Sequence, residues 1–265
     1  MSRELWRAAA RDASGGAAKT WLWAALAWSD IRQRYSGSVL GSLWITANIA
    51  LLTACLTLVF SGPLRATHAD YAPFVAIGLV LWNFIQATLG EAPGVFVASA
   101  ETIRHSPLPL SIHVLRLVAR NAIVLGHNAV IVPVVLILFG VEPGVGLLLV
   151  LLALPLLALS LVAAGFLLGL LGARFRDVPQ IVGSSLQLLF FATPIVWPPV
   201  ALGAGHGWIV AANPVFAFID IVRAPLLGAA PASSSWPVAL ATTVIACALA
   251  AFAFARCRER VVYWV

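Results

Sequence analysis

Residues 30–44 read DIRQRYSGSVLGSLW, and this stretch indicates the fold class of the chain. Its first part is charged and aromatic, ends at Tyr35 and is followed by the small residues 36–38. The chain then enters Val39–Phe60, an apolar run without a charged residue. A run of this length, coiled as a helix, can cross the ~30 Å hydrocarbon layer of a membrane. The stretch therefore predicts a surface segment that leads into a transmembrane helix.

The composition extends this interpretation to the whole chain. Of its 265 residues, 62% are hydrophobic and only 10% are charged, whereas soluble domains carry about 25% charged residues. The apolar runs have the length that helices need to span a membrane. The ~10-residue alternating segments of a transmembrane β-barrel are not visible. We therefore expect an all-α integral membrane protein.

Six apolar runs predict six transmembrane helices in one transmembrane domain that covers residues 1–265. A cytoplasmic or interfacial segment with an amphipathic helix, residues 1–36, precedes the six-span region 37–257, and 258–265 form a cytoplasmic tail. Between the last two spans, 207–212 and 216–227 are too short to cross, so we expect re-entrant or surface helices on the outer face. The expected spans are Val39–Phe60, Phe74–Gly90, Ile112–Phe139, Gly146–Leu171, Ile181–Val196 and Val238–Ala255.

The basic residues predict the orientation, because positive charge collects on the cytoplasmic side of membrane proteins. With the N-terminus inside, 13 basic residues fall on cytoplasmic segments and only Arg65 and Arg223 on outer ones. We therefore expect both termini in the cytoplasm. Arg120 lies within the third span, where it either snorkels to the surface beside Arg116 or faces a translocation path. The 13 are Arg3, Arg7, Arg11, Lys19, Arg32, Arg34, Arg104, Arg116, Arg174, Arg176, Arg256, Arg258 and Arg260.

The sequence lacks the motifs of an enzyme or of an ATP-binding protein. A P-loop requires Gly-Lys-Ser/Thr, and the single lysine, Lys19, follows an alanine. No catalytic motif and no metal-ligand spacing among the histidines and cysteines occurs. We expect no catalytic residue, no metal and no cofactor on this chain. The pair His127-Asn128 is interpreted as a polar contact between packed helices.

Two expected cytoplasmic segments could receive force from a partner. Residues 95–105 have apolar residues at helical spacing, and the prolines at 107 and 109 end the helix. This helix is either an interfacial element or a docking element for a cytosolic partner. The short loop 173–180, ARFRDVPQ, is either a positively charged turn or a second part of such a docking surface.

Several motifs, in order, resemble the membrane subunits of ABC-type polysaccharide exporters of the O-antigen, capsule and teichoic-acid type. The matching segments are Arg32-x-Arg34-Tyr35 with Leu40-Gly41, residues 103–110 (IRHSPLPL), residues 174–178 (RFRDV), Leu186-Gln187, Phe190-Phe191, residues 193–195 (TPI), Asn213-Pro214 and residues 223–228 (RAPLLG). The combination, spread over about residues 20–260, carries the resemblance.

The resemblance implies a homodimer in the bacterial inner membrane, driven by two copies of a separate ATPase subunit that holds ATP and Mg. The substrate would be a polysaccharide on a polyprenyl diphosphate or another lipid anchor. Two alternatives remain open: a permease for another lipid or a drug, and a membrane transferase that acts on polyprenyl lipids. The missing acidic motif disfavours the transferase.

Candidate site residues fall into three groups. The candidate entry for the lipid anchor consists of Arg32, Arg34, Tyr35, Leu40 and Gly41. The two arginines could bind the diphosphate of the anchor, because arginine binds phosphate in a bidentate manner. Ordinary binding of lipid headgroups would also explain these arginines. The candidate path for sugars consists of Trp44, Phe60, Trp82, Phe84, Phe190 and Phe191, each of which could equally face lipid or pack in the core. The candidate contacts with the ATPase are Glu91, Ser99, Glu101, Arg104, Arg174, Arg176 and Asp177.

Overall fold

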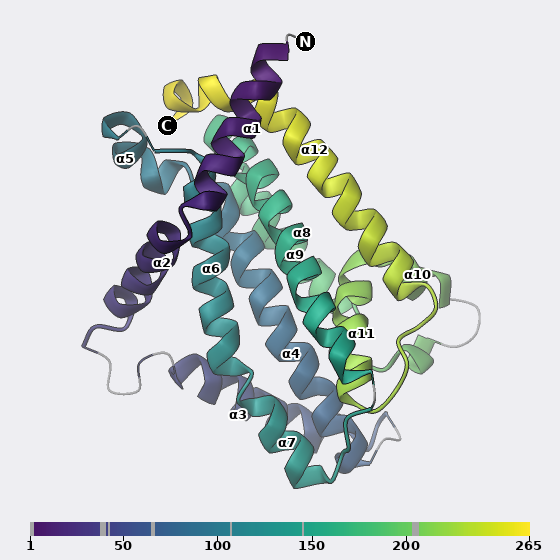
Figure 1. Cartoon of the computed structure of the whole chain (residues 1–265). Helices are drawn as coiled ribbons and strands as arrows, with labels where there is room; N and C mark the ends of the chain where they lie inside the picture. Colours follow the sequence, from purple (N-terminus) through teal and green to yellow (C-terminus); the bar gives the residue numbers. More distant parts are fainter. Residues whose placement is uncertain are drawn as a thin grey trace.

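The computed structural model describes residues 3–37, 41, 43–64, 67–106, 108–144, 146–202 and 207–265 (Figure 1). Within these ranges the regular secondary structure is helical, and no β-strand occurs. The α-helices are α1 Arg3–Ala18, α2 Thr20–Arg34, α3 Leu43–Phe60, α4 His68–Glu91, α5 Ala100–His105, α6 Ser111–Asn128, α7 Ile131–Phe139, α8 Leu147–Arg174, α9 Val178–Ala192, α10 Gly207–Ala211, α11 Pro214–Leu226 and α12 Ser235–Trp264. Three 3₁₀ helices, η1 Ala92–Gly94, η2 Val97–Ser99 and η3 Pro199–Leu202, lie in the connections.

In the described part of the chain, five helical segments are long and apolar enough to cross a membrane. They are Leu43–Phe60, His68–Gly94, Ser111–Phe139, Leu147–Arg174 and Ser235–Trp264. The all-helical membrane class predicted by the composition is therefore confirmed. The remaining expected span corresponds to α9, an apolar helix of 15 residues. The structure places it earlier in the sequence than expected, because the chain leaves the helix at Thr193.

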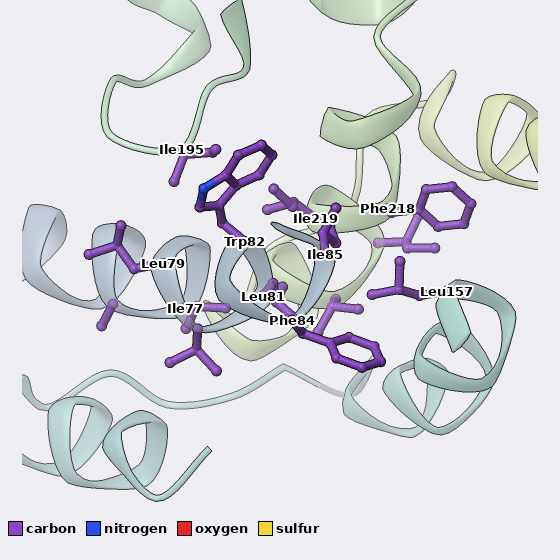
Figure 2. Close-up of a cluster of buried hydrophobic side chains, with 14 of the residues drawn as sticks. Ile77, Leu79, Leu81, Trp82, Phe84, Ile85, Leu157, Ile195, Phe218 and Ile219 are labelled. Atoms are coloured by element: carbon purple, nitrogen blue, oxygen red, sulfur yellow. The ribbon is translucent and has the colours of Figure 1, made fainter. Parts of the chain in front are cut away.

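Helix α4 is the centre of the bundle and the most buried of the candidate spans. It packs against α3, α6, α7, α8, α9 and α11. Figure 2 shows Trp82 beside Ile195 on one side of α4 and Phe84 toward the other side. Because residues that are two apart on a helix point in nearly opposite directions, α4 contributes side chains to the core in several directions at once.

The third candidate span consists of two helices, α6 and α7, with a break at Ala129 and Val130. Pro133 has no N–H to donate to the carbonyl group of Ala129, so the helical hydrogen bonding is interrupted there. Asn128, at the end of α6, is fully buried. Its side chain accepts a hydrogen bond from the Thr46 hydroxyl at 2.9 Å and donates one to the Asn83 amide oxygen at 3.2 Å. Of the predicted polar pair, Asn128 thus joins α3, α4 and α6, whereas the His127 ring bonds to the carbonyl oxygen of Ile123 on its own helix.

Helix α8 packs along α12 and reaches the turn after α4 through glycines. A Cβ atom at position 172 would lie 2.1 Å from the carbonyl oxygen of Pro93, and one at position 169 would lie 2.7 Å from a methyl group of Val95. Only glycine allows the two backbones to approach this closely. The contact holds the segment after α4 against the same end of α8 as Arg174.

Residues 193–196, directly after α9, are irregular, and the first three of them are buried. Thr193 and Ile195 are fully buried. The carbonyl oxygen of Pro194 accepts a hydrogen bond from Arg223 at 2.9 Å, and that of Val196 accepts one from the Tyr71 hydroxyl at 2.6 Å. Non-helical backbone is tolerated at membrane depth only where protein or water satisfies its polar groups, and here side chains do so.

Figure 1 shows both termini, α1 and α5 at one end of the molecule, whereas α7 lies at the opposite end. Helix α3 lies at a steep angle to α4 and α6 in this view. The segment expected as a tail, 258–265, is the continuation of α12 as far as Trp264. The two expected short helices are α10 and α11, and the expected amphipathic helix at 95–105 is divided into η2 and α5.

Candidate substrate groove and charged cavity

A groove of about 510 Å³ runs between α3, α4 and α9. Its walls combine apolar, aromatic and amide side chains. The lining residues are Ile49, Leu52, Leu79, Trp82, Asn83, Gln86, Gly183, Leu186, Gln187, Phe190 and Phe191. Ligand sites commonly pair apolar walls with a few polar groups that fix orientation. The groove therefore has the composition of a site for an amphiphilic molecule.

Three of the predicted path aromatics meet in this groove. The ring centroids of Trp82 and Phe190 are 5.7 Å apart, and those of Phe190 and Phe191 are 5.3 Å apart. These separations lie within the range of favourable aromatic contacts. Trp82 is buried, whereas Phe191 is exposed. The pair of phenylalanines thus extends the buried aromatic contact to the open side of the groove.

The other three predicted path aromatics lie elsewhere. Phe84 is buried in the core. Trp44 and Phe60 are exposed at the two ends of α3 and do not line the groove. Because α4 turns by 100° per residue, Trp82 and Phe84 cannot face the same groove. The tertiary structure therefore places three of the six predicted path aromatics outside the groove.

The amide side chains of the groove are the residues that sequence reasoning missed. Asn83 and Gln86 are three residues apart on α4, and Gly183 and Gln187 are four apart on α9. Each pair therefore lies on one face of its helix. Gln86 and Gln187 are exposed although their helices are apolar. The helical spacing of uncharged amides inside two apolar runs is the signal that could have identified them.

A second cavity, of about 420 Å³, lies where α2, α4, α6 and the start of α9 meet. Asp30 and Arg116 form its most regular ion pair, in which Arg116 Nε is 2.7 Å from Asp30 Oδ2 and Arg116 Nη2 contacts Oδ1. Such a bidentate pair fixes both planes and is strong for an ion pair. It ties α2 to α6. The lining residues are Asp30, Gly90, Glu91, Gly94, Val95, Ala98, Ser99, His113, Arg116, Leu117, Arg120 and Pro179.

Glu91 joins the same network from the end of α4. Its carboxylate contacts Arg120 Nη2 and lies 3.4 Å from Arg34 Nη2. Arg120 Nη1 is also 3.5 Å from Asp30 Oδ2. Arg120 therefore lies between two carboxylates, with a side chain that is 20% exposed. The intramembrane arginine of the sequence is paired inside the protein.

The charged cavity and the groove adjoin each other along the same two helices. On α4, Gly90 and Glu91 line the cavity and Gln86 lines the groove one turn away. On α9, Pro179 lines the cavity and Gly183 lines the groove, again one turn away. Along the seam between α4 and α9 the lining thus changes from charged to amide and then to aromatic.

The candidate entry residues are only partly brought together. Arg34 faces the charged cavity through Glu91. Arg32 is exposed and lines a shallow surface cavity with Trp28 and Gln33 instead. Gly41 has a left-handed backbone with φ of +53°, a conformation that favours glycine, and Leu40 lies outside the described residues. Tyr35, at the end of α2, is half-buried.

Most of the candidate ATPase contacts gather at the end of the molecule that carries the termini. Ser99, Glu101 and Arg104 lie on η2 and α5. Arg174, the last residue of α8, and Arg176 and Asp177, between α8 and α9, are exposed. Two contacts attach the end of α12 to this surface. Arg104 donates to the carbonyl oxygen of Val265, and the guanidinium of Arg174 lies 5.3 Å from the centre of the Trp264 ring. Glu91 differs from the others because its carboxylate is engaged by the arginines of the cavity.

Comparisons with known proteins agree with the resemblance read from the motifs. The family model of ABC-2 type transporters matches residues 22–227. An O-antigen export system permease protein RfbA of Klebsiella pneumoniae is 26% identical over 194 residues, which cover 72% of this chain and 74% of the relative. The protein of the same name from Myxococcus xanthus is 24% identical over 200 residues, with 74% and 76% covered. The chain therefore belongs to the ABC-2 type transporter family.

Proposed function

We propose that this chain is the membrane half of an ATP-driven exporter that moves a lipid-linked polysaccharide from the cytoplasmic to the outer leaflet of the bacterial inner membrane. The observation that carries the proposal is the groove between α4 and α9, in which amides lie beside aromatic rings. Amides can hydrogen-bond the hydroxyl groups of sugars, and aromatic faces can cover their apolar C–H surfaces. The names of the curated relatives, which describe O-antigen export, point to the same substrate class.

The proposal includes six crossings with both termini in the cytoplasm. Helix α9 has 15 residues and is therefore roughly 22 Å long. Residues 193–196 turn rather than extend, since the Ile195 N–H bonds to the Thr193 carbonyl oxygen at 2.7 Å. The crossing is therefore shorter than the ~30 Å hydrocarbon layer, and local thinning of the bilayer accommodates it. Arg104, Arg174 and Arg258 then lie on the cytoplasmic side, as the positive-inside rule requires. Helices α10 and α11 form the outer re-entrant segment.

Two copies of the chain form the path in this proposal. The side of α9 that faces away from α4 is apolar and exposed at Ile181 and Leu188. A second copy against α9 would cover this surface and close the open side of the groove. Each copy binds a separate ATPase subunit through η2, α5 and the turn 174–177, since the chain carries no P-loop. ATP and Mg belong to that subunit.

The test is ATP hydrolysis by the complex of this chain with its ATPase, reconstituted in lipid nanodiscs. We expect polyprenyl-diphosphate-linked polysaccharide to stimulate hydrolysis more than the lipid anchor alone. Gln86→Leu and Gln187→Leu remove the amides of the groove and should abolish the extra stimulation by the glycan. Gln33→Leu, an equivalent change at an exposed position on α2, is the matched control.

The alternatives give different results in the same assay. A permease for a drug or a simple lipid would be stimulated by that compound and would ignore the glycan. Equal stimulation of the two groove variants and the wild type by the glycan would refute the groove as the sugar path. Release of a transferred group in the absence of the ATPase subunit would indicate a transferase.

A further inference from the structure

The charged residues that line the cavity balance, and a third arginine adds positive charge at its rim. Three arginines, Arg34, Arg116 and Arg120, contact two carboxylates, those of Asp30 and Glu91. The cavity lining holds two of these arginines, Arg116 and Arg120, and both carboxylates, so the lining is neutral. The excess charge of +1 in the network lies on Arg34, whose side chain is 52% exposed at the rim of the cavity. The side chains of Asp30 and Arg120 are 13% and 20% exposed. The buried pairs therefore balance each other, and the positive charge of Arg34 at the rim attracts an anion to the opening of the cavity.

His113 adds an unused donor to the same cavity. It lines the cavity, its exposed fraction is 4%, and neither ring nitrogen has a hydrogen-bond partner among the described residues. The Nε atom of Arg120 is likewise buried and unpartnered there. Buried polar groups in native proteins are normally hydrogen-bonded. A buried imidazole and a guanidinium nitrogen without partners, in a cavity with an arginine at its rim, therefore point to a missing acceptor.

We propose that this cavity binds the phosphate group of a lipid, with Arg116, Arg120 and His113 as the surrounding donors. The inference rests on the proposed function, in which the cavity lies at the cytoplasmic end of the path. Two sources share this chemistry: the diphosphate anchor of the exported glycan, and an ordinary anionic phospholipid. A volume of about 420 Å³ lies within the usual range of ligand pockets. A diphosphate at this point would leave its glycan beside Gln86 and the groove.

One ion pair of this network is held rigidly, whereas another can be replaced by a ligand. Asp30 holds Arg116 through two atoms of each side chain, which makes a rigid wall. Glu91 lies 3.4 Å from Arg34, and the Arg34 side chain is half exposed. An incoming phosphate can therefore compete with Glu91 for Arg34 without disturbing the pair between α2 and α6. Arg32 does not take part, because it faces away from the cavity.

The experiment measures equilibrium binding of radiolabelled farnesyl diphosphate to the full chain in phosphatidylcholine nanodiscs. Farnesol serves as the probe without phosphate and inorganic pyrophosphate as the competitor without a tail. Loss of one hydrogen bond to a charged group weakens binding by roughly tenfold or more. We therefore expect at least about tenfold weaker binding for His113→Leu and Arg120→Gln. His127→Leu on the same helix and Arg32→Gln on α2 should leave binding unchanged.

Arg120→Gln leaves Glu91 without its partner, so a second variant is needed to separate loss of binding from misfolding. The double change Glu91→Gln with Arg120→Gln keeps a neutral hydrogen-bonding pair at the same place, and thermal unfolding checks that the protein is intact. This variant should also lose the probe. Wild-type binding in the double variant and in His113→Leu, with loss in Arg32→Gln, would overturn the proposal and locate the anchor at the exposed arginine.

Two further outcomes assign the source of the phosphate and separate this inference from the function. If farnesyl diphosphate binds undiminished in nanodiscs rich in phosphatidylglycerol, the site is specific for the diphosphate anchor. If phosphatidylglycerol displaces farnesyl diphosphate, the site binds the phosphate of ordinary lipids. If the wild type binds the probe but the glycan fails to stimulate ATP hydrolysis, the export proposal fails and the phosphate site stands. If stimulation by the glycan is intact in His113→Leu and Arg120→Gln and their binding is unchanged, export stands and the site is wrong.

Discussion

Asp12 of α1 and Arg258 of α12 form an ion pair with 2.9 Å between Oδ2 and Nε, although 246 residues separate them. The Asp12 side chain is almost fully buried. Its carboxylate also accepts hydrogen bonds from the backbone N–H groups of Leu110 and Ser111, each at 3.1 Å. One carboxylate thus binds the start of α6 and the end of α12 to α1, at the end of the molecule where we expect the ATPase.

Replacement of Asp12 by alanine should destabilise the protein by about 2–4 kcal/mol, because it removes the acceptor for two buried N–H groups and leaves Arg258 unpaired. Thermal unfolding in detergent measures the effect. Glu4→Ala, an exposed acidic position on the same helix, is the control and should change little. Equal unfolding temperatures for the two variants would contradict the role of Asp12.

Gly172→Ala should destabilise the protein by about 1–3 kcal/mol, the usual cost of overpacking. The new Cβ atom would meet the backbone of Pro93, so η1 must move away from α8. Gly126→Ala is the matched control, since no atom lies within 4 Å of its Cβ position, and alanine is the better helix former by about 1 kcal/mol. We expect the two variants to change the unfolding temperature in opposite directions, and a shift in the same direction would refute the close contact.

Arg223→Met should loosen the segment after α9. Arg223 is buried, donates to Pro194 and lies with its guanidinium carbon 3.8 Å from the centre of the Phe74 ring. Loss of a buried charged hydrogen bond and of the cation–π contact amounts to about 2–4 kcal/mol. Hydrogen exchange at residues 193–196, followed by mass spectrometry, should become faster in this variant. Arg176→Met, at an exposed position, should leave exchange there at the wild-type rate.

Thr46 and Asn128 should be coupled energetically through their hydrogen bond. A double-mutant cycle with Thr46→Val and Asn128→Leu tests this, because it isolates the pairwise interaction. Hydrogen bonds between membrane helices average about 0.6 kcal/mol, and we expect a coupling of that size from unfolding in detergent. The same cycle with Thr57→Val, whose hydroxyl group bonds to the carbonyl oxygen of Thr53 on its own helix, should give no coupling.

Much of the fold could be predicted from local pattern. The helices α4, α8 and α12 lie where uninterrupted apolar runs placed them, since a chain in a membrane must satisfy its backbone hydrogen bonds within each helix. Pro133 divided the third run. Helix α9 ended early at Thr193, where the side chains of Asn213 and Tyr71 donate to the carbonyl oxygens of Ala192 and Val196 and Asn213 also donates to the Thr193 hydroxyl. Such contacts join residues that are 20 to 125 positions apart, and no local pattern contains them.

The candidate site, like the fold, could be predicted only in part from the sequence. Trp82, Phe190 and Phe191 were predicted as path residues and line one groove, whereas Phe84 points into the core and Trp44 lies at the end of α3. Gln86 and Gln187 were missed as path residues, although uncharged amides at helical spacing inside two apolar runs could have identified them. Whether these residues handle sugars stays a prediction until the reconstituted complex is assayed.

The sequence by itself determined that this chain is an all-helical membrane protein of the ABC-2 type, because hydropathy and short motifs depend only on the order of residues. Only the tertiary structure decided which charges in the described chain meet. From the sequence, Arg120 either snorkels beside Arg116 or faces a path, and Glu91 is a candidate contact with the ATPase; the structure brings the two together in an ion pair beside Asp30. The physical reason is that burying one charge requires its partner nearby, and only the packing of α2, α4 and α6 brings those partners together. The stretch 30–44 thus contributes Asp30 to the lining of the charged cavity and Arg34 to its rim, while its Arg32 stays on the surface.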